Sequence, residues 1–402
     1  MRHELVRLGD VASFIRGVTF KPEDVVSLEA KRAVACMRTR NVQEELDLSD
    51  VWGISEDLVK RDDQYLIEGD VLVSSANSWN LVGKCCVVPR LPWRATFGGF
   101  VSVLRPERRK VDPRYLFRWF ASDRIQKTVR SFGQQTTNIA NLNIDRCLGL
   151  MIPLPSIAEQ QRIAQILNKA DALRAKRRAA LAQLDTLTQS IFHEMFGDPA
   201  SSEKRWRASR IGDVADVQGG LQLSSTRKQH HREVPYLRVA NVHRRRLDLN
   251  LIKTMTPSDA EIARTRLVTD DLLVVEGHGN VSEIGRSALW DGSIPECVHQ
   301  NHLIRVRFHP NRIVPVYACE YLNSPSGRRH LLRAGKTTSG LNTITVSEVR
   351  STPIAVPPVE LQQNFALRMA AVSELRSKYQ AALGNADALF ASLQHRAFRG
   401  EL

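Results

Sequence analysis

The side chains best suited to chemistry on another molecule gather in two polar loops between predicted strands. The first, Asn77-Ser78-Trp79-Asn80 before Gly83-Lys84, offers two amides, an aromatic ring and a cation. The second, Glu276-Gly277-His278-Gly279-Asn280 before Gly285-Arg286, stands at the corresponding place further along the chain. Amides, Arg and Lys hydrogen-bond to base edges, and cations contact phosphates. Against the alternative of ordinary Asn- and Gly-rich turns, we predict DNA contacts from Asn77, Trp79, Asn80, Lys84, His278, Asn280 and Arg286.

Two further polar segments precede long predicted helices, and they read Gln134-Gln135-Thr136-Thr137-Asn138 and Lys336-Thr337-Thr338-Ser339. Each is either a second contact loop or a glycine-led turn with threonine capping. The run Arg244-Arg245-Arg246 is either a phosphate clamp or a solvated charge run, and Arg38, Arg40 and Arg238 are weaker candidates. From these segments we select as candidate DNA contacts Gln135, Thr136, Asn138, Arg244, Arg245, Lys336, Thr337 and Ser339.

The motifs give no support to catalysis by the chain itself. The sequence contains neither NPP nor G-x-G-x-x-G, which base methylation would use, and neither G-x-S-x-G nor H-E-x-x-H. Gly335-Lys336-Thr337 resembles the end of a phosphate loop, but His330 replaces the leading glycine. His230-His231 lies in a basic polar run and is interpreted as solvated loop. The six cysteines show no zinc spacing, so we expect no metal and mostly buried, reduced thiols.

The positive charge is concentrated in two blocks of the chain. The formal net charge is +14, with 23 Lys and Arg against 19 Asp and Glu in residues 1–155, and 23 against 16 in residues 198–358. Such an excess is typical of nucleic-acid contact surfaces, although solvated surface alone can also produce it. Because neither a membrane span nor a signal-peptide core is evident, we expect a cytoplasmic protein without a membrane partner.

Long amphipathic helices separate the two blocks. From Glu159 to Phe196, apolar residues recur at three- and four-residue steps without Gly or Pro, which predicts a helix long enough for a coiled coil. At an offset of 202 residues the pattern returns, with Pro155 matching Pro357 and Leu173 matching Leu375. We predict that the two helices pair with each other as an antiparallel coiled coil.

The blocks repeat as well. Arg7-Leu8-Gly9-Asp10-Val11-Ala12 returns as Arg210-Ile211-Gly212-Asp213-Val214-Ala215, and shorter landmarks recur between divergent stretches. Short strands are predicted over residues 65–67, 70–74, 83–88, 99–104, 272–275, 285–289 and 302–308, with helices at 113–122 and 315–324. The predicted fold class is α/β, with an internal pseudo-twofold repeat. The domains are block one (1–155), first helix (156–197), block two (198–358) and second helix (359–402).

This order resembles the specificity subunit of type I restriction-modification systems. The residues that carry the resemblance are IPLPSIAEQQRIA from Ile152 and IAVPPVELQQNFA from Ile354, the helix ends IFHEMFG and LQHRAFRGEL, and the block starts RLGDVA and RIGDVA. Together they span the whole chain. The sequence departs from a perfect repeat at Ala355, which stands where Pro153 sits, and at the basic run Lys176-Arg177-Arg178.

The resemblance implies that each block is a target-recognition domain reading one half of a bipartite site in double-stranded DNA. The helices would set the gap and dock two methyltransferase subunits, and restriction subunits would join through the complex. S-adenosylmethionine, ATP and Mg would bind to partner subunits, with no cofactor on this chain and no catalysis by it. Phe192, Phe196 and Phe398 at the helix ends are the candidates for methyltransferase docking. The main alternative is a basic coiled-coil assembly protein that binds nucleic acid without sequence discrimination.

Overall fold

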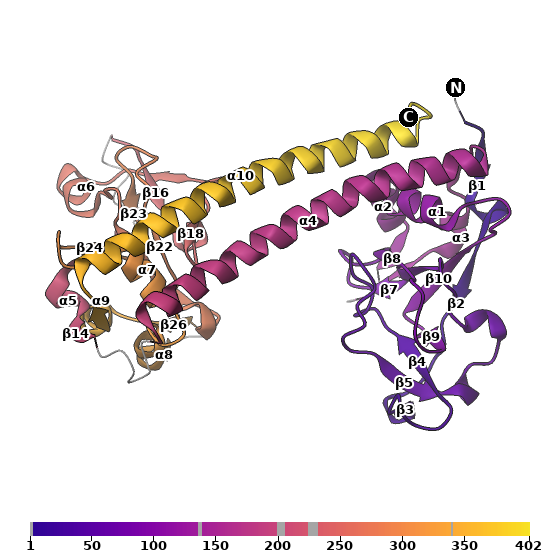
Figure 1. Ribbon diagram of the computed structural model, residues 1–402, viewed down its shortest axis with the longest axis horizontal. Helices are drawn as coiled ribbons and strands as arrows, with labels where there is room; N and C mark the ends of the chain where they lie inside the picture. Colours follow the sequence, from indigo (N-terminus) through magenta and orange to yellow (C-terminus); the bar gives the residue numbers. More distant parts are fainter. Residues whose placement is uncertain (1–2, 136–138, 199–205, 224–231, 339–340) are drawn as a thin grey trace. The chain divides into compact units, whose positions relative to one another are not determined.

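In the computed structural model the chain divides into two compact units (Figure 1). Unit 1 comprises residues 1–178 and 381–402, and unit 2 comprises residues 179–380. Each unit therefore contains one mixed α/β block and part of both long helices. The structure describes residues 3–135, 139–198, 206–223, 232–338 and 341–402.

Helices α4 (Ile157–Phe196) and α10 (Val359–Ala397) confirm the two long helices. Their amphipathic sequences contain no internal proline, and Gly384 lies within α10 without interrupting it. A Cβ atom at Gly384 would meet nothing within 4 Å, so packing does not require glycine there. The interior of α10 consequently tolerates a residue that lowers helix propensity by about 1 kcal/mol.

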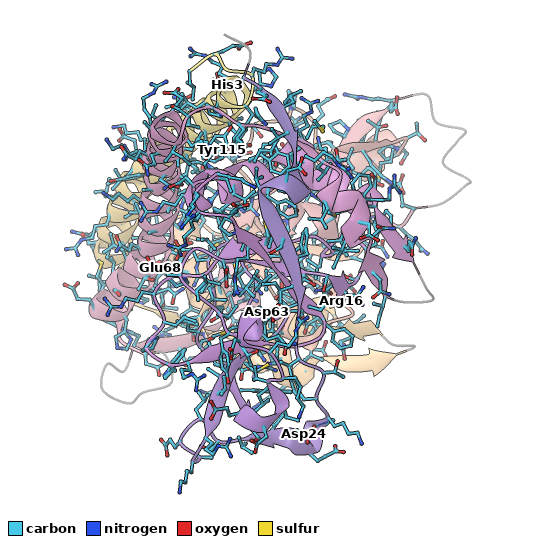
Figure 2. The ribbon with its side chains drawn as sticks, turned by 90° about the vertical axis from the view of Figure 1, so that its right-hand side faces the viewer. His3, Arg16, Asp24, Asp63, Glu68 and Tyr115 are labelled. Carbon is cyan, nitrogen blue, oxygen red and sulfur yellow. The ribbon has the colours of Figure 1, made fainter. Side chains whose placement is uncertain are left out.

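Block one is built on an antiparallel sheet in the order β2-β10-β6-β8, with helices α1, α2 and α3 beside it. A second sheet, β3-β5-β4-β9, carries Asp24 near its far end, away from Tyr115 and His3 (Figure 2). The strands of these two sheets are β2 (Ala12–Arg16), β3 (Val25–Val26), β4 (Ala33–Met37), β5 (Trp52–Ser55), β6 (Val71–Ser74), β8 (Cys85–Val87), β9 (Ala95–Phe97) and β10 (Val101–Pro106). The remaining elements are β1 (Leu5–Arg7), β7 (Ala76–Asn77), β11 (Gly133–Gln135), β12 (Ala140–Leu142), β13 (Met151–Pro153), α1 (Pro113–Phe120), α2 (Asp123–Ser131) and α3 (Ile144–Leu148).

Block two repeats this plan, since its main sheet has the order β15-β24-β20-β22. A sheet in the order β19-β16-β23 takes the place of the second sheet, and its β16–β23 pair is parallel like β4–β9. The strands are β14 (Arg207–Arg210), β15 (Ala215–Gly219), β16 (Val234–Leu237), β17 (Val242–His243), β18 (Arg246–Leu247), β19 (Lys253–Met255), β20 (Leu272–Val275), β21 (Gly277–His278), β22 (Ser287–Leu289), β23 (Val298–His299), β24 (Leu303–Phe308), β25 (Lys336–Thr338), β26 (Leu341–Thr343) and β27 (Pro353–Val356). The helices are α5 (Ile211–Val214), α6 (Asp259–Thr265), α7 (Pro315–Asn323), α8 (Arg329–Ala334) and α9 (Val346–Ser351).

One predicted strand is wrong. Residues 65–67 follow a 3-10 turn at Asp62–Gln64 and form no strand. The cause is Asp70, whose side chain accepts a hydrogen bond from the Ile67 backbone N–H at 3.0 Å and so closes a turn just before β6. The apolar residues 65–67 therefore belong to a turn, because the buried Asp70 carboxylate takes a backbone N–H that a strand would donate to a neighbouring strand.

Asp70 also explains why its landmark recurs in both blocks. The Arg105 guanidinium donates two hydrogen bonds to Asp70, at 2.7 and 2.8 Å, and Asp70 is fully buried. In block two Arg307 donates two bonds of 2.7 Å to buried Asp271, which also accepts the Val268 N–H. Bidentate pairs of this kind fix geometry as well as charge. The repeated Asp thus belongs to the scaffold.

A second repeated device joins each block to a long helix. Gln160 of α4 is fully buried, accepts the Asp112 N–H at 2.8 Å and donates to the Pro155 carbonyl at 2.9 Å. Gln362 of α10 accepts the Val314 N–H at 2.8 Å and donates to the Pro357 carbonyl at 2.8 Å. Buried amides need such partners. The repeated Gln therefore fastens the first turn of each helix to its own block.

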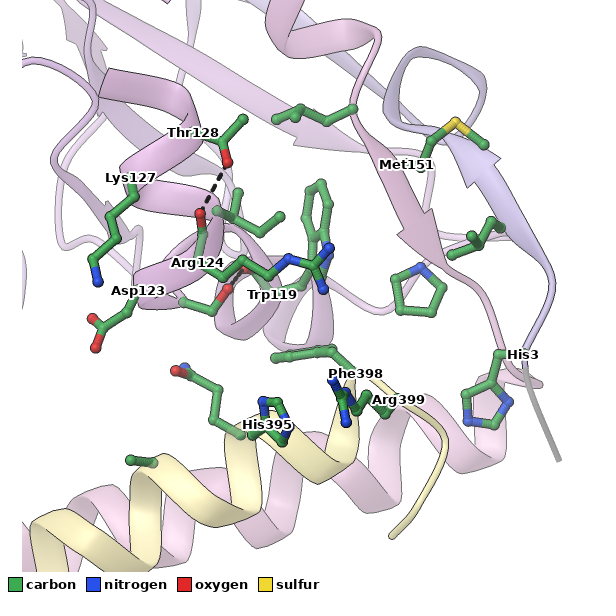
Figure 3. Close-up of a pocket in the computed structure, with 17 residues that line it drawn as sticks. His3, Trp119, Asp123, Arg124, Lys127, Thr128, Met151, His395, Phe398 and Arg399 are labelled. Carbon is green, nitrogen blue, oxygen red and sulfur yellow. Dashed lines mark hydrogen bonds between the residues drawn. The ribbon is translucent and has the colours of Figure 1, made fainter. Parts of the chain in front are cut away.

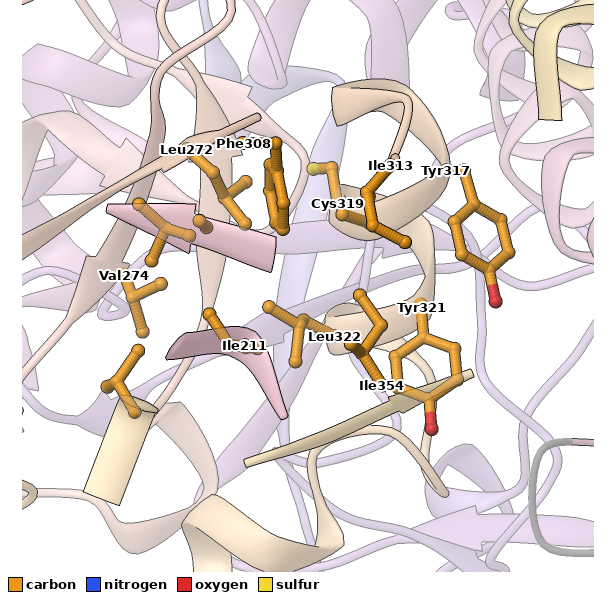
Figure 4. Close-up of a cluster of buried hydrophobic side chains, with 14 of the residues drawn as sticks. Ile211, Leu272, Val274, Phe308, Ile313, Tyr317, Cys319, Tyr321, Leu322 and Ile354 are labelled. Carbon is orange, nitrogen blue, oxygen red and sulfur yellow. The ribbon is translucent and has the colours of Figure 1, made fainter. Parts of the chain in front are cut away.

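Each unit has its own apolar core that includes helix residues. In unit 2 the core gathers residues from the main sheet, from α5, α7 and α9, and from both long helices, and Figure 4 shows Leu272, Val274 and Phe308 among them. In unit 1 the core includes Ile163 and Leu167 of α4 with Ala397 of α10. The long helices are thus integral to the folding of both blocks.

The middle of the helix pair combines ion pairs with a few buried apolar side chains, among them Leu184 of α4 and Ala386 of α10. In unit 1 Asp171 pairs with Arg118 at 2.7 Å and with Arg174 at 2.9 Å, and Arg174 reaches Asp387 of α10 at 2.6 Å. In unit 2 Arg376 of α10 pairs with Asp185 of α4. These contacts confirm antiparallel pairing, but some stripe residues are exposed where a continuous coiled coil would bury them: Leu173, Leu187, Leu375 and Leu389.

Candidate nucleic-acid interface

The fold brings together the two polar segments that were selected in each block. In block one β12 pairs with both β11 and β7, so that Ala140 lies opposite Gln135 on one side and Asn77 on the other. In block two β26 pairs with β25 and β21, so that Asn342 lies opposite Thr337 and His278. Segments separated by about 60 residues of sequence therefore share one small three-stranded sheet in each block.

In block one this surface presents an exposed tryptophan. Trp79 is 44% exposed and its ring lies over Gly133, where a Cβ atom would come within 3.3 Å of the ring. Asn80 is exposed, whereas Asn77 donates to the Ser74 hydroxyl at 3.0 Å and accepts the neighbouring backbone N–H. Trp79 and Asn80 are thus available to a ligand, and Asn77 mainly shapes the turn.

Lys84 is half-buried and its ammonium group donates to the Gln43 side chain. Gln43 itself is exposed, and its amide donates to the Arg40 carbonyl at 2.6 Å. The Gln43 amide is neutral, whereas a phosphate oxygen carries negative charge, so a phosphate adds a direct charge–charge attraction to the Lys84 ammonium that the amide cannot match. Lys84 therefore remains a candidate phosphate contact.

In block two His278 and Asn280 stabilise their own loop. The His278 Nδ1 accepts the Asn280 N–H at 3.0 Å, and the Asn280 side chain accepts the Ser282 N–H at 2.9 Å, which caps a 3-10 turn at Val281–Glu283. Asn280 is exposed and His278 is half-buried. Both keep polar atoms near the surface of the small sheet, so both remain candidate contacts.

The arginines selected in block two are engaged by groups of the protein itself, and the Arg244 and Arg245 side chains remain 25% exposed. Arg286 is only 7% exposed and pairs with Glu283 at 2.8 Å. Arg245 donates to buried Glu320 at 2.5 Å. Arg244 donates to the Ser282 carbonyl at 3.1 Å, and burial lowers the pKa of its guanidinium. The arginines of a basic run can thus form ion pairs within the protein, and the sequence alone does not show that Glu283 and Glu320 are their partners.

The weaker candidates Arg38 and Arg238 likewise belong to the scaffold. Asn41 accepts the Arg38 backbone N–H at 2.8 Å, and Asn241 accepts that of Arg238 at 3.0 Å, which explains the repeated Arg and Asn landmarks. The Arg38 guanidinium also stacks 3.6 Å from the Trp52 ring centre and pairs with Asp50. Arg40 shares Asp50 at 3.0 Å but is largely exposed.

Three selected positions, Thr136, Asn138 and Ser339, lie outside the described residues, as do Thr137 and the pair His230-His231. Gln135, Lys336 and Thr337 are placed by the backbone pairings of β11 and β25 alone. Their assignment as contacts therefore rests on their strands, which occupy the edge of each small sheet.

Sequence reasoning missed two residues beside the small sheets. Phe100 is 63% exposed at the turn before β10, and its carbonyl accepts the Ser75 N–H. His302 holds the matching position in block two and accepts the Glu276 N–H. The sequence Gly98-Gly99-Phe100 looks like the start of a strand, so it does not show that the Phe100 ring is exposed. Only the structure places this exposed aromatic ring beside a candidate contact surface.

Phe192 and Phe196 are core residues, which corrects their assignment as docking sites. They are 5% and 3% exposed, and their rings contact those of Tyr317 and Phe365 with centroid distances of 4.7–5.8 Å. The helix end does have cover, because the block itself supplies it. Phe398 is half-buried, 5.6 Å from the Tyr115 ring, and it remains a candidate for docking.

We expect Phe196→Ala to destabilise unit 2 by about 3–5 kcal/mol, the usual cost of truncating a buried aromatic residue. Urea unfolding of the isolated chain measures this change. Leu187→Ala is the matched control on the same helix, because Leu187 is 43% exposed and should cost less than about 1 kcal/mol. Equal stability of the two variants, with partner binding lost only in Phe196→Ala, would restore the docking assignment.

Phe398 borders a cleft of about 1000 Å³ in unit 1. Its walls come from α2, from the β1–β13 pair and from the end of α10, and Figure 3 shows Trp119 and Met151 beside Arg124, Lys127 and Arg399. The cleft combines an apolar floor with cationic edges. Among the described residues no group of three His, Cys, Asp or Glu side chains could hold a metal ion there or elsewhere.

Neither the cysteine thiols nor the helices in the described part of the chain point to another kind of site. All six cysteines are free, and five are buried, as expected. Burial raises the pKa of the Cys36 thiol to about 12, so this group is not a nucleophile at neutral pH. No helix in the described part of the chain has the length and apolar character needed to cross a bilayer.

Comparison with known proteins agrees with this architecture. Residues 3–183 match the family model of the type I restriction modification DNA specificity domain. The chain is 27% identical to the type I restriction enzyme EcoKI specificity subunit of Escherichia coli K12, over 98% of this chain and 87% of that subunit. It is 26% identical to the StySPI specificity subunit of Salmonella potsdam, with the same coverage.

Two solved structures share the fold. The type I restriction-modification S subunit from M. genitalium is 14% identical, with a TM-score of 0.57 over 98% of this chain and 96% of that one. A chain from a structural study of type I system assembly is 17% identical, with a TM-score of 0.58 over 100% and 98%. The family model over residues 3–183 and the relatives over almost the whole chain show that this chain is similar to the specificity subunits of type I restriction-modification systems, and the solved structures show that it shares their fold.

Proposed function

We propose that this chain is the DNA-recognition subunit of a type I restriction-modification complex and that each block reads one half of a bipartite site. The observation that carries the proposal is the pair of three-stranded sheets, β11-β12-β7 and β25-β26-β21. The two sheets have the same backbone pairing, yet they present different side chains. Shared scaffolds with divergent surfaces suit two readers of different sequences, whereas a nonspecific binder gains nothing from such divergence.

In this proposal the chain recognises the DNA sequence, and its partner subunits carry out the chemical reactions. Two methyltransferase subunits dock on the helices, and restriction subunits join through the complex. S-adenosylmethionine, ATP and Mg bind to those partners, consistent with the absence of methyltransferase motifs from this sequence. The chain's own residues bind and orient DNA.

The assignment of block one is tested by Trp79→Ala and Asn80→Ala, which remove two exposed side chains of its loop. We expect each variant to relax discrimination in one half-site only, by about 1–3 kcal/mol for each lost base contact. The measurement is binding selection on a duplex library by the complex reconstituted with methyltransferase subunits. Gln183→Ala, on the helix pair, is the control and should leave both half-sites unchanged.

Relaxation of both half-sites together would show that the blocks do not read independently. Unchanged discrimination in a complex that still binds its site would place the reading surface of block one elsewhere. Absence of any sequence preference in the wild-type complex would favour the nonspecific assembly protein.

A further inference from the structure

Glu276 occupies a fixed position beside the small sheet of block two. Its N–H donates to the His302 carbonyl at 3.0 Å, and its carbonyl accepts the Ile344 N–H at 2.9 Å. Ser75 takes the same place in block one, between Phe100 and Leu142, through bonds of 3.0 and 2.8 Å. The two blocks thus hold one backbone position in the same way and equip it with different side chains.

The Glu276 carboxylate is half-buried and has no hydrogen bond or ion pair with any residue in the described parts of the chain. Burial alone raises its pKa to about 7. Nearby Glu283 behaves differently, because the hydrogen bond from Arg286 lowers its pKa. Partly desolvating an unpaired carboxylate costs free energy. Although block two has more Lys and Arg than Asp and Glu, none of its described cations forms an ion pair with the Glu276 carboxylate.

We propose that Glu276 is a specificity-determining residue that accepts a hydrogen bond from the exocyclic amino group of cytosine in the half-site of block two. The inference rests on the proposed function, since it requires that block two faces DNA. Its place is next to β21, whose His278 is one of the candidate contacts.

The chemistry of the bases selects cytosine. An ionised carboxylate only accepts hydrogen bonds, and cytosine offers its N4 amino group in the major groove. A hydrogen bond donated to the ionised form stabilises that form, so contact with this amino group lowers the pKa of the Glu276 carboxyl from its raised value and keeps the group ionised. Guanine and thymine present acceptors at O6 and O4, which repel a carboxylate, and adenine sets an N7 acceptor beside its amino group. Phosphates repel it too. A carboxylate on a DNA-facing surface therefore contributes chiefly by rejecting the wrong bases.

Two substitutions separate this role from others. Glu276→Gln keeps the shape but adds donors, and amides prefer adenine N6 and N7. Glu276→Ser installs the residue that block one carries. Asp216→Asn is the matched loss of one negative charge in the same block, because Asp216 is largely exposed, with His309 3.8 Å away.

The experiment uses the reconstituted complex with methyltransferase subunits and duplexes randomised in both half-sites, with the gap fixed at the length that wild type selects. We expect wild type to select cytosine at one position of the block two half-site. Glu276→Ser should weaken that preference roughly tenfold, which corresponds to about 1.4 kcal/mol. Glu276→Gln should shift it toward adenine, and Asp216→Asn should change nothing.

A Glu276→Gln complex that binds DNA and keeps the cytosine preference would overturn the inference, as would a change in the block one half-site. Glu276→Gln decides the question if Glu276→Ser unfolds, and thermal unfolding identifies that case. Failure of the proposed function is distinguishable, because the wild-type complex would then show no half-sites at all.

Discussion

DNA affinity of the assembled complex is expected to fall about a thousandfold or more between 50 and 200 mM salt. Both blocks carry excess positive charge, and each neutralised phosphate contributes roughly −0.9 to the log–log slope. About six phosphate contacts would give a slope near −5. Fluorescence anisotropy on a specific duplex and a scrambled duplex, over a salt series, measures both slopes. A flat response would contradict phosphate binding by these blocks.

The structure makes the salt experiment specific to individual cations. Lys84→Ala should reduce the slope by about 1, because a phosphate has to displace only the exposed Gln43 amide from the Lys84 ammonium. Arg286→Ala should leave the slope unchanged and lower the stability instead, since Arg286 is buried and paired with Glu283. The opposite pattern would mean that the internal ion pairs open when DNA binds.

Sequence periodicity predicted the long helices because the spacing of apolar residues is a local signal, and the repeat was visible because its landmarks recur in the same order. α4 begins two residues before the predicted Glu159, and α10 begins at the predicted 359. The main-sheet strands were found where apolar runs end at Gly or Asp, such as β6 after Asp70 and β20 after Asp271. Those buried Asp residues recur because each closes a turn and accepts two hydrogen bonds from an Arg guanidinium, and neither role tolerates a change of chemistry.

Contacts distant in sequence explain why some candidate residues turn out to be engaged within the protein. Phe192 looked uncovered because the sequence does not show that Tyr317, 125 positions later, stacks on it. Arg245 looked like a phosphate ligand because its partner Glu320 lies on α7. The same limitation hid Glu276, whose significance comes from the lack of a partner among the described residues rather than from its own motif.

The separation of the two half-sites is expected to follow the length of the helix pair. α4 and α10 each extend through both units, so they are the elements that connect one block to the other. Readers on one DNA face must keep a fixed distance and phase. Lengthening the helices by four residues, about one turn or 6 Å, should therefore increase the preferred gap by one or two base pairs.

Both helices have to be lengthened together. In unit 2, Phe192 and Phe196 of α4 pack on Phe365 of α10, with ring centroids 5.7 and 5.4 Å apart. An insertion after Thr186 alone would displace these rings by about one turn and disrupt the core. A matched insertion after Leu375 keeps the aromatic cluster on one side and the Asp185–Arg376 pair on the other.

Selection on a library of gap lengths, with methyltransferase subunits present, measures the outcome. The doubly inserted chain should select the same half-site sequences at a longer gap and bind the original gap poorly. The single insertion after Thr186 is the contrast, and it should unfold at a lower temperature because Phe192 loses Phe365. Adding one turn to both helices must lengthen any spacing that these helices set. If the double insertion retained the original gap with full activity, something other than α4 and α10 would therefore position the two blocks.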